Sequence, residues 1–165
     1  MAKTRSIGVA MDYSATSKLA LRWAIENLID EGDRMTIIHA VSPNSKADPT
    51  NKQLFQDTGS PLIPLSEFRE IDLGKKYGLV PDAEVLDILD TVSKQKKVIV
   101  VAKVYWGDPR DTICDAVDHL KLDSLVLGSR GLGAIKRVLL GSVSNYVVQN
   151  ATCPVTVVKG GPSKR

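Results

Sequence analysis

The sequence has few cysteines and no long apolar run. Its 165 residues include two cysteines, Cys114 and Cys153, which lack the CxxC spacing of redox and zinc motifs. These counts exclude a disulfide scaffold and favour a reducing compartment, so we expect a cytoplasmic protein. No segment approaches the roughly 20 apolar residues of a membrane-spanning helix, and the first residues lack the apolar region of a signal peptide. We therefore expect no membrane partner.

The body of the chain also lacks net charge. The formal charge is +3, from 22 basic and 19 acidic residues, and three of the basic residues, Lys159, Lys164 and Arg165, lie in the last seven positions. Residues 1–158 are therefore neutral, whereas nucleic-acid-binding domains usually carry a basic face. We expect no nucleic-acid partner. The length and the 43% of hydrophobic residues instead predict one folded domain over residues 1–165.

Short apolar runs alternate with amphipathic segments along most of the chain. Runs rich in β-branched residues predict strands, and apolar residues at three- and four-residue spacing predict helices. The expected strands are residues 6–11, 35–41, 98–105, 124–127 and 155–158. The expected helices are residues 16–31, 83–96, 109–120 and 142–149. Gly32 is expected to cap the first helix at its carboxyl end.

This alternation predicts an α/β fold, with a five-stranded parallel sheet and helices on both faces. Right-handed crossovers leave two common strand orders, 3-2-1-4-5 and 2-1-3-4-5. We adopt 3-2-1-4-5, because it makes the first and fourth strands neighbours. The ends of these two strands carry the polar and glycine-rich residues discussed below.

Residues 43–82 interrupt the alternation. Five prolines punctuate this stretch, and only residues 66–77 have a helical pattern. Both flanking segments read as parts of the same sheet, so a long, weakly periodic stretch between them predicts an insertion within one domain. Such insertions in compact domains are usually functional or specific to a family.

The residues that follow the fourth expected strand are rich in glycine. Gly128 and Gly131 lie just after the strand, and Gly141 and Ser142 open the next helix. Glycines allow a ligand to approach the backbone closely, and a helix N-terminus attracts anions, so this segment predicts a phosphate-binding loop. Additional donors are expected from Arg130, Ser142 and Ser144. In the alternative interpretation, the glycines only turn the chain and cap a helix.

Other phosphate motifs fit less well. A Walker loop requires Gly-Lys-Ser/Thr, which is absent, and the third glycine of the dinucleotide pattern is replaced by Lys136. Asp12 follows the first strand, so the chosen strand order brings it to the same crevice as Gly128. An aspartate there can accept hydrogen bonds from a ribose hydroxyl or an adenine amino group. The alternative role of Asp12 is to cap the following helix.

The glycine spacing resembles that of the ATP-binding universal stress proteins, whose motif is Gly, two residues, Gly, nine residues, Gly, Ser/Thr. Gly128, Gly131, Gly141 and Ser142 satisfy it at every position. The insertion, with Gly-Ser-Pro-Leu-Ile-Pro-Leu from Gly59, is similar to that of plant members. The resemblance implies a Rossmann-like fold and a bound adenine nucleotide (ATP, AMP or ADP) with Mg or Mn on its phosphates. It also implies a homodimer joined through residues 155–158.

The same resemblance assigns roles to individual positions. Asp12 is expected to contact the ribose or the adenine. The adenine slot would be lined by Ala40 and Val41. Ribose and phosphate would be held by Leu127, Gly128, Arg130 and Gly131. The remaining phosphate contacts would come from Gly141, Ser142, Val143 and Ser144. On this assignment, Gly128→Val is expected to abolish nucleotide binding while leaving the fold intact.

No catalytic group stands out in the sequence. His39 and His119 have no partner at metal-ligand spacing, so His39 is expected in the core or a pocket wall and His119 on the surface. We expect binding rather than turnover, with at most weak ATPase activity, in a nucleotide-dependent stress-response or signalling dimer. One alternative is an ATP-independent chaperone-like protein whose insertion contacts client or signalling proteins. Another is a phosphoacceptor receiver domain, which needs an acceptor aspartate where Asp108 instead resembles a helix cap.

Overall fold

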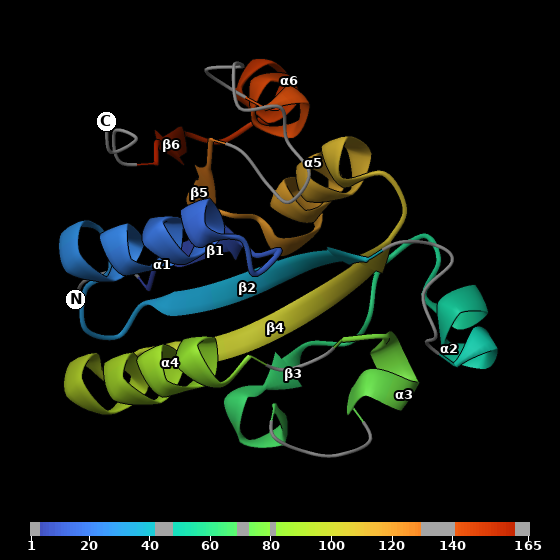
Figure 1. Cartoon of the computed structure of the whole chain (residues 1–165), viewed down its shortest axis with the longest axis horizontal. Helices are drawn as coiled ribbons and strands as arrows, with labels where there is room; N and C mark the ends of the chain where they lie inside the picture. Colours follow the sequence, from blue (N-terminus) through green and yellow to red (C-terminus); the bar gives the residue numbers. More distant parts are fainter. Residues whose placement is uncertain (1–3, 42–47, 69–72, 80–81, 130–140, 161–165) are drawn as a thin grey trace.

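The structure is a computed structural model of the chain, and it describes residues 4–41, 48–68, 73–79, 82–129 and 141–160 (Figure 1). The strands are β1 (Ser6–Ala10), β2 (Arg34–Val41), β3 (Ile63–Pro64), β4 (Ile99–Trp106), β5 (Ser124–Gly128) and β6 (Val155–Val158). The long helices are α1 (Ala15–Asn27), α4 (Ala83–Lys96), α5 (Pro109–Leu120) and α6 (Ser142–Asn150). The short helices are α2 (Pro49–Leu54), α3 (Leu73–Tyr77) and the 3-10 turn Leu65–Glu67.

The strands form a single sheet in the order β3-β4-β2-β1-β5-β6. The five strands predicted from the sequence pair in parallel and in the predicted order, so the α/β fold class is confirmed. The sheet has six strands rather than five, because β3 adds two residues antiparallel to the outer edge of β4. β3 lies within the insertion and contains Pro64, so its sequence has no alternating pattern to reveal it.

Helices cover both faces of the sheet, as predicted (Figure 1). Helices α1 and α4 pack on one face over a core that includes Val9, Ile37 and Leu89. Helices α5 and α6 pack on the other face over a second core that includes Ile38 and Leu125. Adjacent β2 residues therefore belong to different cores, which is the expected result of a strand that is buried on both sides.

Two helix predictions need correction. Helix α1 ends at Asn27 instead of residue 31, and Gly32 does not cap it but lies in the turn before β2 with a φ of +85°. The chain leaves the helix early because the buried Asp33 carboxylate accepts the Asp30 N–H at 2.8 Å and pairs with Arg5 at 2.7 Å. These bonds satisfy polar groups that would otherwise be buried without partners.

The prediction of a helix at residues 66–77 is also wrong for its first turn. The structure has a 3-10 turn at Leu65–Glu67, closed by the Phe68 N–H on the Leu65 carbonyl, and the short helix α3 further on. Helix α2 was not predicted, although Asp48 caps it and Pro49 occupies its first turn. This Asp-Pro start is the same signal that located α5 at Asp108 and Pro109.

The insertion seals the edge of β4 through Ser60, which is fully buried. The Ser60 N–H donates to the Val104 carbonyl at 2.8 Å, and the Ser60 hydroxyl accepts the Val104 N–H at 2.9 Å. Lys103 adds a bond of 2.7 Å from its Nζ to the Ser60 carbonyl. Backbone groups of β4 that would face solvent at an open sheet edge are therefore paired.

Replacing Ser60 with alanine should destabilise the fold. In Ser60→Ala the buried Val104 N–H loses the hydroxyl that accepts its hydrogen bond. We therefore expect the free energy of unfolding to fall by about 1–3 kcal/mol. Urea denaturation measures this change. The control is Ser66→Ala, at an exposed serine of the same insertion; it should shift the free energy by less than about 0.5 kcal/mol. Equal effects of the two variants would contradict the role of Ser60.

Candidate functional site

The carboxyl ends of β1 and β5 lie side by side at one edge of the sheet. The two strands are parallel neighbours, with Val9 opposite Val126. After β1 the chain enters α1 on one face, whereas α6, which follows β5, lies on the other face. This is a topological switch point, where open α/β sheets bind their ligands. The structure thus brings Asp12 and Gly128 to the same edge.

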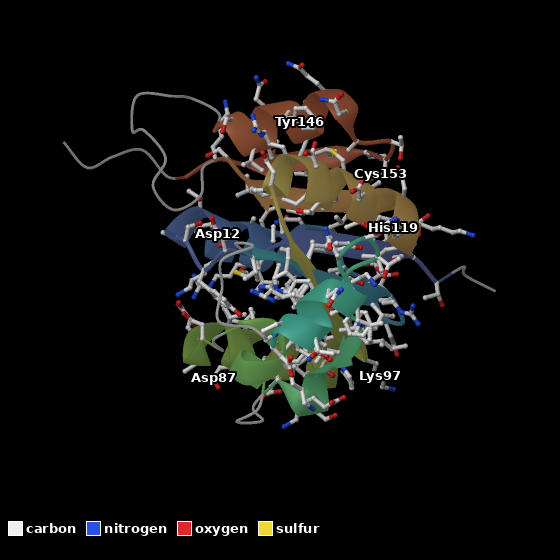
Figure 2. The ribbon with its side chains drawn as sticks, turned by 90° about the vertical axis from the view of Figure 1, so that its right-hand side faces the viewer. Asp12, Asp87, Lys97, His119, Tyr146 and Cys153 are labelled. Atoms are coloured by element: carbon white, nitrogen blue, oxygen red, sulfur yellow. The ribbon has the colours of Figure 1, made fainter. Side chains whose placement is uncertain are left out.

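Asp12 begins the turn between β1 and α1. Its Oδ1 accepts the Ser14 N–H at 2.9 Å, and Ser14 in turn caps α1 by accepting the Ser17 N–H at 3.2 Å. The helix-capping alternative for Asp12 is therefore wrong, because Ser14 is the cap. Asp12 is exposed at the surface (Figure 2), where its carboxylate can meet a ligand.

Tyr13 and Thr16 also lie in or next to this turn, and neither was predicted from the sequence to belong to the site. Tyr13 has a φ of 64°, a left-handed conformation that non-glycine residues rarely adopt. Thr16, in the first turn of α1, lies against Gly128: a Cβ atom on that glycine would be 2.8 Å from the Thr16 carbonyl carbon. A tyrosine gives no local signal for a left-handed turn, and a contact between residues 16 and 128 has no sequence signature.

This contact changes the expected role of Gly128. Because a side chain at Gly128 would collide with the backbone of α1, the glycine is needed for close packing of α1 on β5. The expectation that Gly128→Val leaves the fold intact is wrong for this reason. Loss of nucleotide binding in such a variant would not separate a binding defect from a folding defect.

We therefore expect Gly128→Ala, the smallest change, to lower the free energy of unfolding by about 1–3 kcal/mol through forced movement of α1. The comparison is Gly160→Ala, where the new Cβ would meet only the Thr16 methyl group at 3.1 Å, which can move aside. In thermal and urea denaturation, Gly128→Ala should be much less stable than Gly160→Ala. If both variants are as stable as the parent protein, the close approach of Thr16 to Gly128 does not stabilise the packing of α1 on β5.

Ala40 and Val41 end β2 at the same edge of the sheet. Val41 is in register with Trp106 of β4, and its carbonyl accepts the Gly107 N–H at 3.1 Å. Trp106 is buried and packs near Tyr77 of α3, with ring centroids 6.4 Å apart. Helix α2 lies beyond the ends of β2 and β4 (Figures 1 and 2), so the insertion borders the predicted adenine slot.

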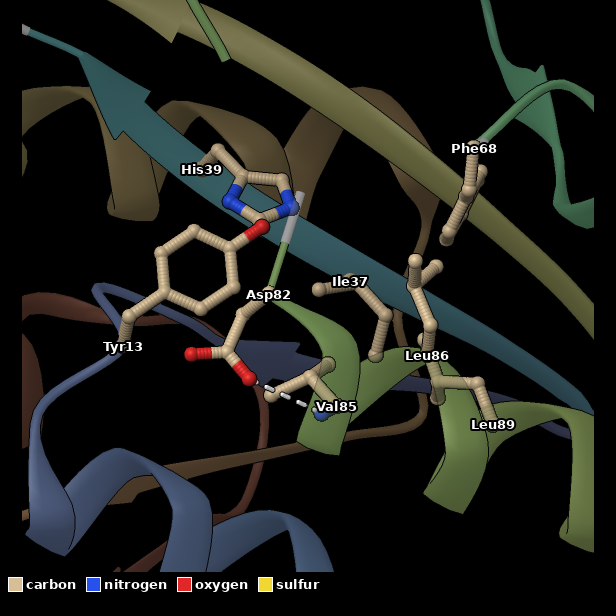
Figure 3. Close-up of a pocket in the computed structure, with 8 residues that line it drawn as sticks. All are labelled: Tyr13, Ile37, His39, Phe68, Asp82, Val85, Leu86 and Leu89. Atoms are coloured by element: carbon tan, nitrogen blue, oxygen red, sulfur yellow. Dashed lines mark hydrogen bonds between the residues drawn. The ribbon is translucent and has the colours of Figure 1, made fainter. Parts of the chain in front are cut away.

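A small cavity lies beside Tyr13, between β2 and α4 (Figure 3). Its volume of about 10 Å³ is room for roughly one water molecule. The cavity is lined by Tyr13, Ile37, His39, Phe68, Asp82, Val85, Leu86 and Leu89. His39 is 3% exposed, and its ring centroid is 5.5 Å from that of Tyr13. The prediction that His39 belongs to the core or a pocket wall is confirmed, and His119 is exposed as expected.

Burial lowers the pKa of His39 from its usual 6.5 to about 4, although a backbone hydrogen bond with Met11 partly opposes the shift. His39 is therefore neutral at pH 7. Protonation below pH 6.5 favours the unfolded chain, so stability should fall as the pH drops from 6.5 towards 4.

The pH dependence of stability tests this burial. Between pH 7 and pH 5 the parent protein should lose about 2 kcal/mol of unfolding free energy through His39. In His39→Gln this part of the loss disappears, whereas His119→Gln, at the exposed histidine, keeps it. Urea titrations at the two pH values give the difference. A loss that is unchanged in His39→Gln would show that His39 is accessible to protons.

The four phosphate-contact candidates lie in the first turn of α6. Gly141 is its N-cap, with no side-chain cap, whereas Ser14, Asp82 and Asp108 cap the other three long helices. Within the described part of the chain, no side chain caps the first N–H groups of α6. Ser144 is buried, and its hydroxyl donates to the Ser129 carbonyl at 2.8 Å, which ties the end of β5 to α6.

The bond from Ser144 to Ser129 holds the end of β5 close to the start of α6. The Leu127 side chain is buried in the second core. Arg130 and Gly131 lie outside the described residues. In the described part of the chain, no group of three or more His, Cys, Asp or Glu side chains can hold a metal ion. The same residues contain no helix that is both long enough and apolar enough to span a bilayer.

The sheet order and the switch point between β1 and β5 are those of a doubly wound α/β protein. Residues 3–159 match the model of the universal stress protein family. The chain is 34% identical to Universal stress protein PHOS34 of Arabidopsis thaliana, over 94% of this chain and 62% of that protein. The chain therefore belongs to the universal stress protein family, and it spans less than two thirds of the length of this relative.

Solved structures have the same fold. The universal stress protein UspA of Lactobacillus plantarum superposes with a TM-score of 0.62 at 24% identity, over 96% of this chain and 99% of that one. A universal stress protein family protein of Arabidopsis thaliana, solved with AMP bound, gives a TM-score of 0.57 at 25% identity, over 97% of each chain. These similarities agree with the predicted family.

Proposed function

We propose that this universal stress protein binds an adenine nucleotide, with ATP as the preferred form, in the crevice between β1 and β5. The main support is the uncapped N-terminus of α6, which supplies backbone N–H groups to an anion at the edge that also presents Asp12. The AMP found in the Arabidopsis relative supports an adenine nucleotide. The groups present suit such a ligand, since a carboxylate can accept from a sugar or base and N–H groups can donate to phosphate.

In this proposal the ligand runs along the edge of the sheet from β2 to α6. The adenine lies against Ala40 and Val41, and Asp12 accepts from the ribose or the base. Ribose and phosphate lie over Leu127, Gly128, Arg130 and Gly131. The phosphates contact Gly141, Ser142, Val143 and Ser144. The Ser144 contact would use its backbone N–H, because its hydroxyl is bonded to Ser129. Mg or Mn would bind through the phosphates, because we find no dedicated metal site among the described residues.

We favour binding over turnover. Hydrolysis requires a base or a water-orienting group near the terminal phosphate. The Asp108 carboxylate caps α5 and also pairs with Arg110 at 2.6 Å. Its oxygens therefore already have hydrogen-bond partners within the chain. The Arg110 guanidinium holds the pKa of Asp108 below its usual value, which makes it a poor base. Any ATPase activity is therefore expected to be slow, and the bound nucleotide acts as a stress-response signal.

A homodimer through β6 completes the proposal. In the described sheet β6 is an end strand that pairs only with β5, and its four residues, all valine or threonine, are half-buried. A second copy can pair with this edge and bury the side chains that remain exposed. Nucleotide-dependent contacts across this edge would transmit the signal to client or signalling proteins. A cytoplasmic location suits Cys114 and Cys153, which are free thiols.

One observation favours a second function. Leu54 of α2 is 68% exposed and Leu62 is 39% exposed, and both belong to the insertion. Exposed leucines on a segment peripheral to the sheet suit contact with client proteins. An ATP-independent chaperone-like role would then depend on these residues, and Leu54→Ser should reduce aggregation suppression while leaving nucleotide affinity unchanged.

A charge placed at the α6 N-cap separates phosphate binding from folding. Gly141→Asp and Gly141→Asn both provide a capping side chain, so both should keep or slightly raise the stability of α6. Gly141→Asp also places a carboxylate where the phosphates should lie. We expect it to weaken ATP binding at least tenfold more than Gly141→Asn does, with little effect on adenosine binding.

Calorimetric titration of ATP and adenosine, with Mg²⁺ present, measures these affinities. The same samples analysed by sedimentation report the oligomeric state with and without nucleotide. If the parent protein binds neither ligand, the proposed function is wrong. If the two Gly141 variants bind ATP equally, the phosphates do not lie at the N-terminus of α6.

A further inference from the structure

Helices α1 and α4 lie side by side on one face of the sheet, and polar side chains join them near both ends (Figure 1). Near the N-termini, Arg22 of α1 pairs with Glu84 of α4 at 2.6 Å. Near the C-termini, Lys96 of α4 donates from its Nζ to the carbonyls of Ile25 and Ile29. These contacts fix the two helices relative to each other at two separate levels.

Between these two levels, a groove of about 330 Å³ runs between the helices, and we call it the α1–α4 groove. Ile25 of α1 and Ile88 of α4 line it, together with Val92, which is 2% exposed. Ile25 and Ile88 are only half-buried, so part of their apolar surface is open to solvent. The volume lies within the range of pockets that bind ligands. The groove therefore offers an accessible apolar lining.

The rim of the α1–α4 groove is acidic. The two cations of its lining are already engaged, since Arg22 pairs with Glu84 and the Lys96 ammonium bonds to backbone carbonyls. The carboxylates of Glu26 on α1 and Asp87 on α4 are exposed at the rim. A basic group seated between them would be attracted from both helices. The groove therefore suits an occupant with positive charge beside an apolar face.

The walls of the groove favour a helical occupant. Both walls are helices, whose backbone groups are hydrogen-bonded within each helix, so they cannot pair with an added strand. The stretch of α4 from Glu84 to Lys96 extends about 18 Å, which is the length of about three helical turns. A helix of this length can place its apolar side chains between the ridges of α1 and α4.

We propose that the α1–α4 groove docks an amphipathic helix of a partner protein. The apolar face of that helix covers Ile25 and Ile88, and its lysine or arginine residues meet Glu26 and Asp87. Among the described residues, no candidate for nucleotide contact lines the groove. Partner binding is therefore separate from nucleotide binding, and it remains if the proposed function fails.

The probe is a helical peptide of about 14 leucine and lysine residues, with the leucines at three- and four-residue spacing. Its control peptide has glutamate in place of every lysine. In calorimetric titrations of the full chain, the basic peptide should bind at least tenfold more tightly than the acidic one, and added salt should weaken its binding. The amide resonances of Ile25 and Ile88 should move when the basic peptide is added, whereas that of Val147 in α6 should not. If the basic peptide does not bind, the proposal is wrong.

Charge reversal tests whether the peptide lies in the groove. Glu26→Lys and Glu31→Lys change the net charge equally, but Glu26 lines the groove and Glu31 lies beyond the end of α1. Affinity for the basic peptide should fall about fivefold or more in Glu26→Lys and stay within twofold of the parent value in Glu31→Lys. Equal losses would show a general attraction to the acidic surface and would overturn the proposal.

Filling the groove provides a second test. Thr91→Trp adds an indole at an exposed position that lines the groove, and Thr50→Trp makes the same change on α2, outside it. We expect at least a tenfold loss of peptide affinity in Thr91→Trp and parent affinity in Thr50→Trp. If Thr91→Trp instead dissociates an oligomer of the parent protein in sedimentation, a second copy occupies the groove and the proposal is wrong. Should Thr91→Trp not fold, the comparison of Glu26→Lys with Glu31→Lys decides alone.

Discussion

The parallel pairing of β1 with β5 is the constraint on which the rest of the structure depends. It joins two segments more than a hundred residues apart and sends the following helices to opposite faces of the sheet. Open α/β sheets bind their ligands where the chain diverges in this way. The pairing also requires α1 to approach β5 closely, which Gly128 permits at Thr16. This packing contact lies at the edge of the sheet that carries the candidate site.

In the proposed site, an anion would be recognised mainly through backbone N–H groups. The folded body has no net charge, and α6 begins without a capping side chain, so N–H groups carry the local positive potential. Charged side chains elsewhere serve to join elements. Lys18 and Arg22 of α1 pair with Asp82 and Glu84 at the start of α4, which ties the two helices of one face together.

The insertion contacts the common fold at several places. At Ser60 it completes the hydrogen bonding of β4, and at Phe68 it closes the cavity beside Tyr13. The contact at Ser60 pairs backbone groups at an edge of the sheet, and β3 and Tyr77 add further contacts with β4.

The sequence by itself determined the periodic parts of this protein. Helices α4 and α5 and strand β6 have the predicted bounds, because apolar spacing and capping residues are local signals. The glycine spacing and Asp12 likewise located the candidate site. Only the tertiary structure decided how Gly128 meets Thr16, why Tyr13 adopts a left-handed turn and how β3 joins the sheet. These features arise from contacts between distant residues, and such contacts leave no periodic pattern along the chain.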